Sequence, residues 1–209
     1  MNRQFEPSEL VTATDGTPYH IRIRPEALAD NVILVGDPAR VDLIAGKLDK
    51  VGDKTSNREI VSCKGEYKGK PITVLSTGMG VGCIDIVVNE LDICANVDLE
   101  KREPKPIHRS LNLIRIGTCG SLQDDLEVGT HVASAYAIGI DGLAYYYKGL
   151  EKINDEKLIE QFLKQTSWDK KLPYPYAVKA DNELLNRIAS DTHKGITITA
   201  PGFYVPQGR

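Results

Sequence analysis

The chain has 209 residues, of which 41% are hydrophobic and 26% charged, and its net charge is −3. This balance is typical of a soluble globular protein, and a mildly acidic chain without a basic tract does not fit non-specific binding to nucleic acid. The opening residues, MNRQFEPSELVTATDG, hold no apolar stretch of the kind found in secretory signals. No apolar run approaches the roughly 18 residues that span a membrane.

Four cysteines, Cys63, Cys83, Cys94 and Cys119, show no CxxC spacing, and the four histidines do not cluster with them. We therefore expect reduced thiols in a cytoplasmic protein, without a disulfide framework or a zinc site. The length allows a sizeable core, and we expect a single domain over residues 1–209.

The first regular element is a short apolar strand at Asn31–Val35. It ends in the sequence GDPAR, after which apolar residues recur at helical spacing. Asp37 can cap this helix, Pro38 suits its first position, and Gly36 allows a ligand to approach the backbone. Arg40 lies in the first helical turn, where the helix dipole disfavours a cation. A bound anion and a solvated surface position explain Arg40 about equally well.

Two strand-like stretches follow at residues 56–67 and 71–77. Arg58 opens the first of them, where an exposed charge at a strand end is the simplest interpretation. The second runs into the glycine-rich turn TGMGVGC and then into a helix, which is the setting of a dinucleotide-binding turn. Cys83 stands where a third glycine is required, so a tight turn near a bound ligand is favoured. Met79 either lines that site or fills the core.

A charged connection at residues 98–110 leads to the strand Asn112–Ile116 and to a turn at residues 117–120. Arg115 interrupts the apolar residues of this strand, which we expect to be buried. A buried arginine requires an anionic partner, because desolvating an unpaired charge is costly. A structural salt bridge and a bound anion both satisfy that requirement.

The second half of the chain continues the alternation of strands and helices. The expected elements are strands at residues 129–140 and 143–147, a helix at 155–164, an aromatic loop at 168–176, a helix at 181–189 and a strand at 194–199.

This alternation predicts an α/β fold with a mixed, largely parallel central sheet flanked by helices. Ligands bind at the carboxyl ends of the strands in such sheets. Three glycine-rich turns, at residues 36–37, 78–82 and 117–120, follow predicted strands, so we expect them to converge on one edge of the sheet, near Arg115.

Six stretches of the chain resemble the nucleoside phosphorylase superfamily, which includes uridine phosphorylase and hexameric purine nucleoside phosphorylase. They are VGDPAR (35–40), NRE (57–59), STGMG (76–80), RIGTCG (115–120), the strand and turn at 132–142, and GFYVPQGR (202–209). They occur in the family's order, and the uridine phosphorylase branch is the most similar. Sequences of this family continue past the position of Arg209, so the resemblance implies a C-terminally truncated member or one that lacks part of the ribose site.

The resemblance implies a phosphate site and a nucleoside site that share residues. The phosphate site consists of Gly36, Arg40, Arg115 and Thr118, with Arg58 reaching it from a neighbouring subunit. The nucleoside site consists of His20, Met79, Thr118, Cys119, Gly120, Phe203, Gln207 and Arg209. In this arrangement His20 reaches the ribose 5′-hydroxyl across a subunit interface and Phe203 packs on the nucleoside. Arg115, Gln207 and Arg209 would be catalytic, with the last two reading uracil.

The implied reaction is phosphorolysis of uridine, or a related pyrimidine nucleoside, to the base and ribose 1-phosphate. The enzyme would be a pentosyltransferase of nucleoside salvage and a homo-oligomer, dimer or hexamer, with shared active sites. Phosphate would be a co-substrate, and no cofactor is expected. Some bacterial uridine phosphorylases bind a monovalent cation near the positions of Glu59, Met79 and Cys83, but the cysteine here replaces a hydroxyl residue and disfavours the ion.

Four alternatives remain open. A purine phosphorylase is disfavoured by Gln207 and Arg209, and a nucleosidase that uses water does not need the three arginines at positions 40, 58 and 115. A nucleoside-binding module made inactive by truncation, and an NAD-binding domain based on the incomplete glycine turn, are the others.

Overall fold

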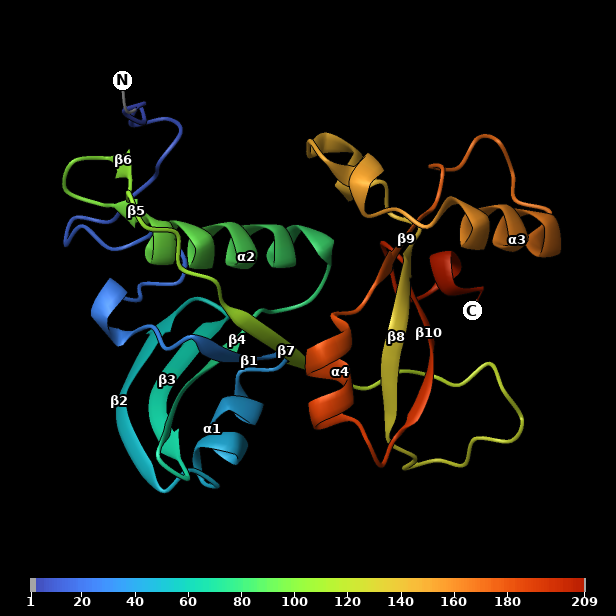
Figure 1. The fold of residues 1–209 in the computed structure, drawn as a ribbon, viewed down its shortest axis with the longest axis horizontal. Helices are drawn as coiled ribbons and strands as arrows, with labels where there is room; N and C mark the ends of the chain where they lie inside the picture. Colours follow the sequence, from blue (N-terminus) through green and yellow to red (C-terminus); the bar gives the residue numbers. More distant parts are fainter. Residues whose placement is uncertain (1–2, 209) are drawn as a thin grey trace. The chain divides into compact units, whose positions relative to one another are not determined.

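The computed structural model describes residues 3–208. The chain divides into two compact units, Met1–Cys119 and Gly120–Arg209, each with its own sheet and its own core (Figure 1). The expectation that residues 1–209 form one domain stays a prediction.

Unit 1 is built on a five-stranded mixed sheet in the order β2-β3-β4-β1-β7. Its strands are β1 (Asn31–Val35), β2 (Lys50–Asn57), β3 (Ile60–Tyr67), β4 (Lys70–Ser76) and β7 (Asn112–Ile116). Strands β4, β1 and β7 run parallel, whereas β2, β3 and β4 form an antiparallel meander. The predicted α/β fold with a mixed central sheet is confirmed, and within this sheet the parallel pairing is confined to three strands.

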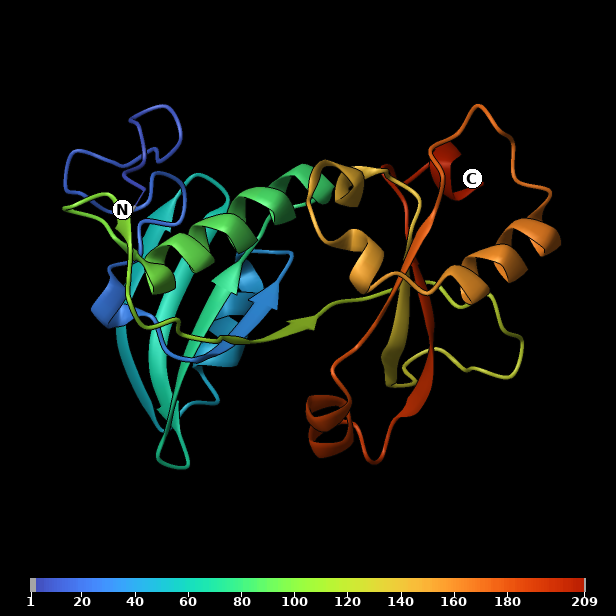
Figure 2. The same cartoon turned by 45° about the horizontal axis from the view of Figure 1, so that its top comes forward.

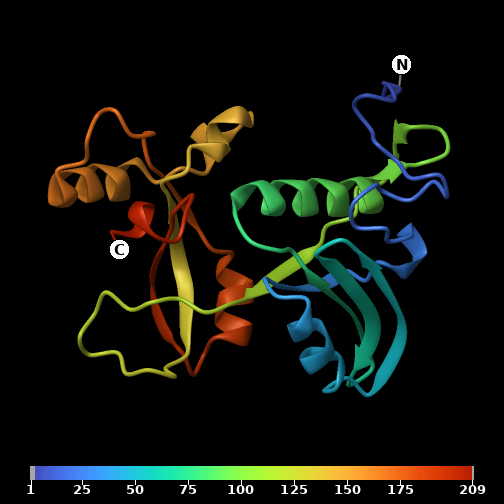
Figure 3. The same ribbon diagram turned by 180° about the vertical axis from the view of Figure 1, so that it is seen from behind.

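Two helices cover opposite faces of this sheet, as Figures 1 and 3 show. They are α1 (Ala39–Ala45) and α2 (Val81–Asn96), and Figure 2 presents α2 in front of the sheet. Val32 and Leu34 of β1 pack with Leu91 of α2, whereas Val35 packs with Val41 of α1. The period-2 alternation of strand side chains thus divides β1 between two helix-covered cores.

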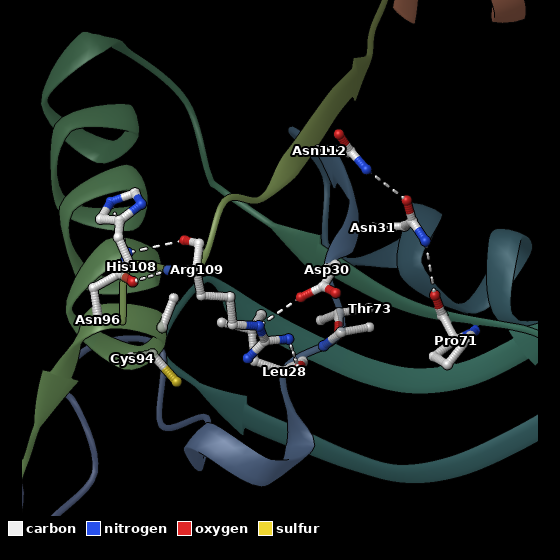
Figure 4. Close-up of polar contacts among 12 residues, drawn as sticks. Leu28, Asp30, Asn31, Pro71, Thr73, Cys94, Asn96, His108, Arg109 and Asn112 are labelled. Atoms are coloured by element: carbon white, nitrogen blue, oxygen red, sulfur yellow. Dashed lines mark hydrogen bonds and ion pairs between the residues drawn. The ribbon is translucent and has the colours of Figure 1, made fainter. Parts of the chain in front are cut away.

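Side-chain hydrogen bonds tie the amino ends of the parallel strands together (Figure 4). Asn112 Nδ2 donates to Asn31 Oδ1 at 3.0 Å, and Asn31 Nδ2 donates to the carbonyl oxygen of Pro71 at 3.3 Å. Just before β7, Arg109 Nε donates to Asp30 Oδ1 at 2.5 Å, and its Nη2 donates to a backbone carbonyl at the same distance. These bonds support the register that places Asn31 beside Asn112.

The connections of unit 1 contain two short elements in addition. One is the 3₁₀ helix η1 (Pro25–Ala27). The other is a two-stranded ladder of β5 (Val97–Asp98) and β6 (Glu103–Pro104), which overlaps the charged connection predicted at residues 98–110.

The single strand expected at residues 56–67 is two strands separated by a tight turn. Arg58 lies in that turn with φ of 54°, so the prediction that it opens a strand is wrong. This left-handed conformation is uncommon for a residue other than glycine. Ser56 and Asn57, which precede Arg58, are residue types that favour turns, and they are the local signal for this reversal.

Unit 2 has a three-stranded sheet in the order β10-β8-β9. Its elements are β8 (Val132–Gly139), η2 (Leu143–Tyr146), η3 (Leu150–Lys152), α3 (Glu156–Thr166), β9 (Tyr176–Lys179), α4 (Asn182–Ile188), β10 (His193–Thr199) and η4 (Val205–Gln207). Strand β10 is parallel to β8 and β9 is antiparallel to it. Ile138 of β8, Ile159 of α3 and Ala177 of β9 form the buried core.

The strand predicted at residues 143–147 is wrong, because this stretch forms the 3₁₀ helix η2. Asp141 Oδ1 accepts a hydrogen bond from the Leu143 N–H at 2.7 Å, and Gly142 adopts φ of 78°. A short acceptor side chain followed by a left-handed glycine reverses the chain and favours a turn over a strand.

No helix in residues 3–208 is long and apolar enough to cross a membrane.

Two leucines of unit 1 provide a matched test of the core. Leu75 of β4 is fully buried, whereas Leu43 of α1 is 69% exposed. We expect Leu75→Ala to lower the free energy of unfolding by about 2–5 kcal/mol, the cost of removing a buried leucine side chain. Leu43→Ala should change it by about 0.5 kcal/mol or less. Urea denaturation measures both, and equal losses would contradict the described packing.

Candidate functional site

The carboxyl ends of the three parallel strands of unit 1 are aligned. Val35, the last residue of β1, is paired with Ser76 at the end of β4 and with Ile116 at the end of β7. The turns that follow these strands, starting at Gly36, Thr77 and Gly117, therefore begin side by side at the carboxyl edge of the sheet. The predicted convergence of the three glycine-rich turns on one edge is confirmed.

Glycines at this edge permit a close approach of backbone and guanidinium. A Cβ added at Gly36 would lie 3.7 Å from the carbonyl oxygen of Gly78 and 3.9 Å from Arg115 Nη2. A Cβ added at Gly117 would lie 2.5 Å from Arg115 Nη1. The guanidinium of Arg115 is thus folded back over the turn that follows its own strand, close to Gly36.

Arg115 is exposed, so the prediction that it is buried is wrong. The reason is the position of β7 at the end of the sheet order, where Asn112 and Ile116 are exposed as well. No carboxylate within the described residues forms an ion pair with Arg115. The internal salt bridge that the sequence left open is therefore not found in residues 3–208, and the guanidinium is available to an external anion.

The other two candidate phosphate arginines lie on different elements. Arg40 is half-buried in the first turn of α1, directly after the turn at Gly36. The helix begins at Ala39 with Pro38 as its N-cap, so the prediction that Asp37 caps it and Pro38 opens it is wrong by one residue. The Asp37 carboxylate still accepts from the Ala39 N–H at 2.9 Å. Arg58 is exposed in the β2–β3 turn, and neither arginine forms an ion pair within residues 3–208.

The β2–β3 turn reaches the same edge of the sheet through Glu59. Ser76 Oγ donates to the backbone carbonyl of Glu59 at 2.8 Å, which ties this turn to the end of β4. Cys83 Sγ lies 4.0 Å from Glu59 Oε1, and both side chains border Gly78. Met79 is 90% exposed, so it does not fill the core. No group of three His, Cys, Asp or Glu side chains that could hold a metal ion occurs in the described part of the chain.

All four cysteines are unpaired. Burial raises the pKa of the Cys63 thiol, and it raises the pKa of Cys94 to about 12. Neither is therefore a nucleophile near neutral pH, since the thiolate is the reactive form. Thr118 and Cys119 are exposed in the turn after β7.

His20 belongs to a hydrogen-bonded cluster in unit 1. Its Nδ1 lies 2.6 Å from Glu90 Oε1, and its backbone N–H donates to the same carboxylate at 2.8 Å from Oε2. Asn57 Nδ2 donates to the carbonyl oxygens of Tyr19 and His20 at 3.2 and 2.9 Å. The guanidinium of Arg58 lies 5.9 Å from the centre of the Tyr19 ring. Arg58 and His20, both assigned by resemblance to a neighbouring subunit's site, therefore contact the same aromatic side chain.

Glu90 was not singled out from the sequence. The signal was present, because Glu90 lies next to Leu91 and three residues after Val87 on the apolar stripe of the helix. A glutamate there is 7% exposed, and buried carboxylates are rare unless they are hydrogen-bonded.

The remaining candidate residues belong to unit 2. Gly120 is its first residue. Phe203 is 59% exposed, with its ring 5.3 Å from that of Tyr204, and Gln207 is the last residue of η4. Arg209 lies outside the described residues.

A half-buried tyrosine, Tyr176, is paired with an aspartate near the start of residues 200–208. Tyr176 Oη donates to Asp141, at 3.0 Å from Oδ1 and 3.1 Å from Oδ2. Burial, and then the Asp141 carboxylate, raise the pKa of the Tyr176 hydroxyl above its ordinary value. Asp141 follows β8, and the Ile140 N–H donates to the carbonyl oxygen of Thr199 at 3.0 Å, at the end of β10. The pair therefore supports the point from which residues 200–208 depart.

Comparison with known proteins places this arrangement in a family. A family profile described as the phosphorylase superfamily matches residues 30–209. The uridine phosphorylase of Thermococcus kodakarensis is 28% identical over 214 residues, which cover 100% of this chain and 64% of that protein. A DeoD-type purine nucleoside phosphorylase of Bacillus thuringiensis is 38% identical over 110 residues, 52% of this chain and 41% of that protein. The chain therefore spans less than two thirds of the length of these relatives.

Among solved structures, the chain is similar to a nucleoside phosphorylase of Trypanosoma brucei described as showing uridine phosphorylase activity. The TM-score is 0.77 at 29% identity, and the match covers 96% of this chain and 71% of the other. The sequence match over residues 30–209 and the shared fold together show that this chain belongs to the phosphorylase superfamily.

Proposed function

We propose that this protein catalyses the phosphorolysis of a pyrimidine nucleoside, converting uridine and phosphate to uracil and ribose 1-phosphate. The observation that carries the proposal is the guanidinium of Arg115, folded over Gly117 close to Gly36 and without an ion pair in the described chain. Relatives named uridine phosphorylase support the same reaction. The enzyme would be a pentosyltransferase that needs no cofactor, because phosphate is itself a substrate.

The proposed phosphate site uses the carboxyl edge of the sheet in unit 1. Arg115 and Arg40 supply N–H donors in fixed forks that suit phosphate oxygens, and Gly36 leaves the backbone open to them. A phosphate oxygen attacks C1′ of the ribose as the C1′–N1 bond breaks, and the electron pair of that bond leaves with the base. The protein's main task is then to hold phosphate beneath C1′ while the sugar passes through an oxocarbenium-like state.

The proposed base site uses the segment after β10 in unit 2. Uracil departs with negative charge spread over its ring, and donors placed where charge develops contribute most to catalysis. Gln207 and Arg209 are proposed to donate to the ring, and Phe203 to pack against the nucleoside.

The proposal also includes a homo-oligomer in the cytoplasm. Arg58 and His20 would be given to the site of a neighbouring subunit, Arg58 to phosphate and His20 to the ribose 5′-hydroxyl. The shared contact of these residues with Tyr19 supports their acting as one group.

A purine nucleoside phosphorylase is the second candidate. The 38% identity to a DeoD-type enzyme over 110 residues favours it, although that match covers only 52% of the chain. Gln207 and Arg209 favour the pyrimidine, because the resemblance assigns this pair to uracil.

The reaction is tested by following base release from uridine and from inosine, each with and without phosphate. We expect uracil to be released from uridine only when phosphate is present, together with ribose 1-phosphate. Release of uracil without phosphate would identify hydrolysis, and preferential release of hypoxanthine would identify the purine enzyme; either result would overturn the proposal.

Arg115→Ala tests the phosphate site, with Arg109→Ala as the matched arginine control. Loss of charge-assisted hydrogen bonds, about 1.5–3 kcal/mol each, should lower kcat/KM for phosphate by about 100-fold in Arg115→Ala. Its free energy of unfolding should change by about 0.5 kcal/mol or less, because Arg115 is exposed. Arg109→Ala should lower the free energy of unfolding by about 1–2 kcal/mol through two lost hydrogen bonds and leave the KM for phosphate unchanged. The reverse pattern would remove Arg115 from the site.

Subunit sharing is tested by mixing two inactive variants, Arg58→Ala and Arg115→Ala. If Arg58 serves the partner's site, a dimer of one Arg58→Ala and one Arg115→Ala subunit has one intact site and one that lacks both arginines. Random reassociation makes half of the dimers mixed, so about one quarter of all sites are restored. We expect activity to rise towards that level after unfolding and refolding together. A mixture that stays as inactive as its parents would show that both arginines act within one subunit.

A further inference from the structure

Glu90 is a buried carboxylate in the core of unit 1. It accepts hydrogen bonds from a single segment of the chain, at His20 and Ile21. It is 7% exposed on α2, and the segment it binds lies about 70 residues earlier in the chain. A carboxylate removed from water is stable only where donors replace its hydration. Its partners therefore indicate what its charge is used for.

Both oxygens of Glu90 receive hydrogen bonds from His20, and one of them also receives the N–H of Ile21. Oε2 accepts from the backbone N–H groups of His20 and Ile21, each at 2.8 Å. Oε1 accepts from the His20 backbone N–H at 3.1 Å and faces His20 Nδ1 at 2.6 Å. Because a carboxylate with its oxygens occupied in this way acts as an acceptor, His20 Nδ1 must carry the proton of their shared hydrogen bond.

The opposite nitrogen of the ring has a different environment. The side chain of His20 is 27% exposed, and Nε2 has no hydrogen-bond partner within residues 3–208. Asn57 holds the backbone of this segment from the end of β2, and the Tyr19 ring packs edge-on against the imidazole, with centroids 5.0 Å apart. In neutral histidine, a proton held on Nδ1 leaves Nε2 as an acceptor in a fixed direction.

We propose that Glu90 is a positioning residue for nucleoside recognition: it fixes the orientation of His20 and its Nδ1–H tautomer, so that Nε2 accepts a hydrogen bond from the ribose 5′-hydroxyl. This inference rests on the proposed function for the identity of the hydroxyl. The assignment of the tautomer rests on the hydrogen bonds alone.

The first experiment compares uridine with 5′-deoxyuridine, which lacks only the hydroxyl that His20 would bind. Selectivity is the ratio of kcat/KM for uridine to kcat/KM for 5′-deoxyuridine. We expect His20→Ala and Glu90→Gln each to lower it by about tenfold, the effect of one lost hydrogen bond. Their kcat/KM for 5′-deoxyuridine should change far less. Combining the two substitutions should add nothing, because both remove the same contact.

Asp92→Asn is the matched control, since it neutralises an exposed carboxylate two residues away on the same helix. Asp92 accepts from Asn96 Nδ2 at 2.8 Å. The selectivity of this variant should equal that of the wild type. If Glu90→Gln lowers kcat/KM equally for both nucleosides, or leaves selectivity unchanged while His20→Ala lowers it, Glu90 has only a structural role and the proposal is overturned. Unchanged selectivity in His20→Ala would overturn it too.

The second experiment needs no substrate, and its decisive measurement is made on the wild-type protein. ¹⁵N NMR of the imidazole nitrogens distinguishes the two neutral tautomers, with the His20 signals assigned by their loss in His20→Gln. We expect the proton of wild-type His20 on Nδ1, and a shift towards the Nε2–H form in Glu90→Gln. A proton on Nε2 in the wild type would overturn the proposal. An enzyme that releases no uracil from either nucleoside, but has His20 protonated on Nδ1, would refute the proposed function and leave the tautomer assignment standing.

Discussion

The pairing of β1 with β4 on one side and β7 on the other is the constraint on which the candidate site of unit 1 depends. It brings residues 35, 76 and 116 level, so that three turns distant in sequence begin side by side. Hydrogen bonds at the opposite ends of these strands, through Asn31, Asn112 and Arg109, oppose a slip of β7 against β1. A slip of one residue would turn Arg115 to the other face of the sheet, because strand side chains alternate with a period of two. Polar contacts far from the site thus help to maintain the position of its principal cation.

In unit 1 the buried carboxylate has hydrogen-bond donors around it, whereas three arginines have no carboxylate partner within residues 3–208. The buried carboxylate of Glu90 is saturated with N–H donors, whereas Arg40, Arg58 and Arg115 form no ion pair in the described chain. Folding accounts for the N–H donors around Glu90, because an unsatisfied carboxylate in the core would be costly. It does not account for three cations left without counterions near glycine-rich turns. An anionic ligand does account for them.

Features that depend on local pattern could be read from the sequence. Strand β1, the turn after it and the helices near residues 155–164 and 181–189 follow from spacing and residue type, and the structure has them. The exposure of Arg115 could not be read, because it depends on β7 being an edge strand, which is a property of the sheet order. The reversal at Arg58 uses a left-handed conformation that its side chain does not announce. The bond between His20 and Glu90 joins residues 70 positions apart, so only the burial of a charge on an apolar helix face hinted at it.

Unit 2 repeats the principle found in unit 1 with different chemistry. Strands β8 and β10 are parallel and end level, with Gly139 beside Thr199, and the segments after them carry Asp141 and Phe203. In unit 1 the corresponding edge carries arginines and open backbone, which suit an anion, whereas in unit 2 it leads to an aromatic ring and an amide, which suit a flat polar base. The two edges therefore differ in the ligand chemistry that their residues suit. Each edge is fixed by its own strand register and its own core, so its geometry depends on contacts within its own unit.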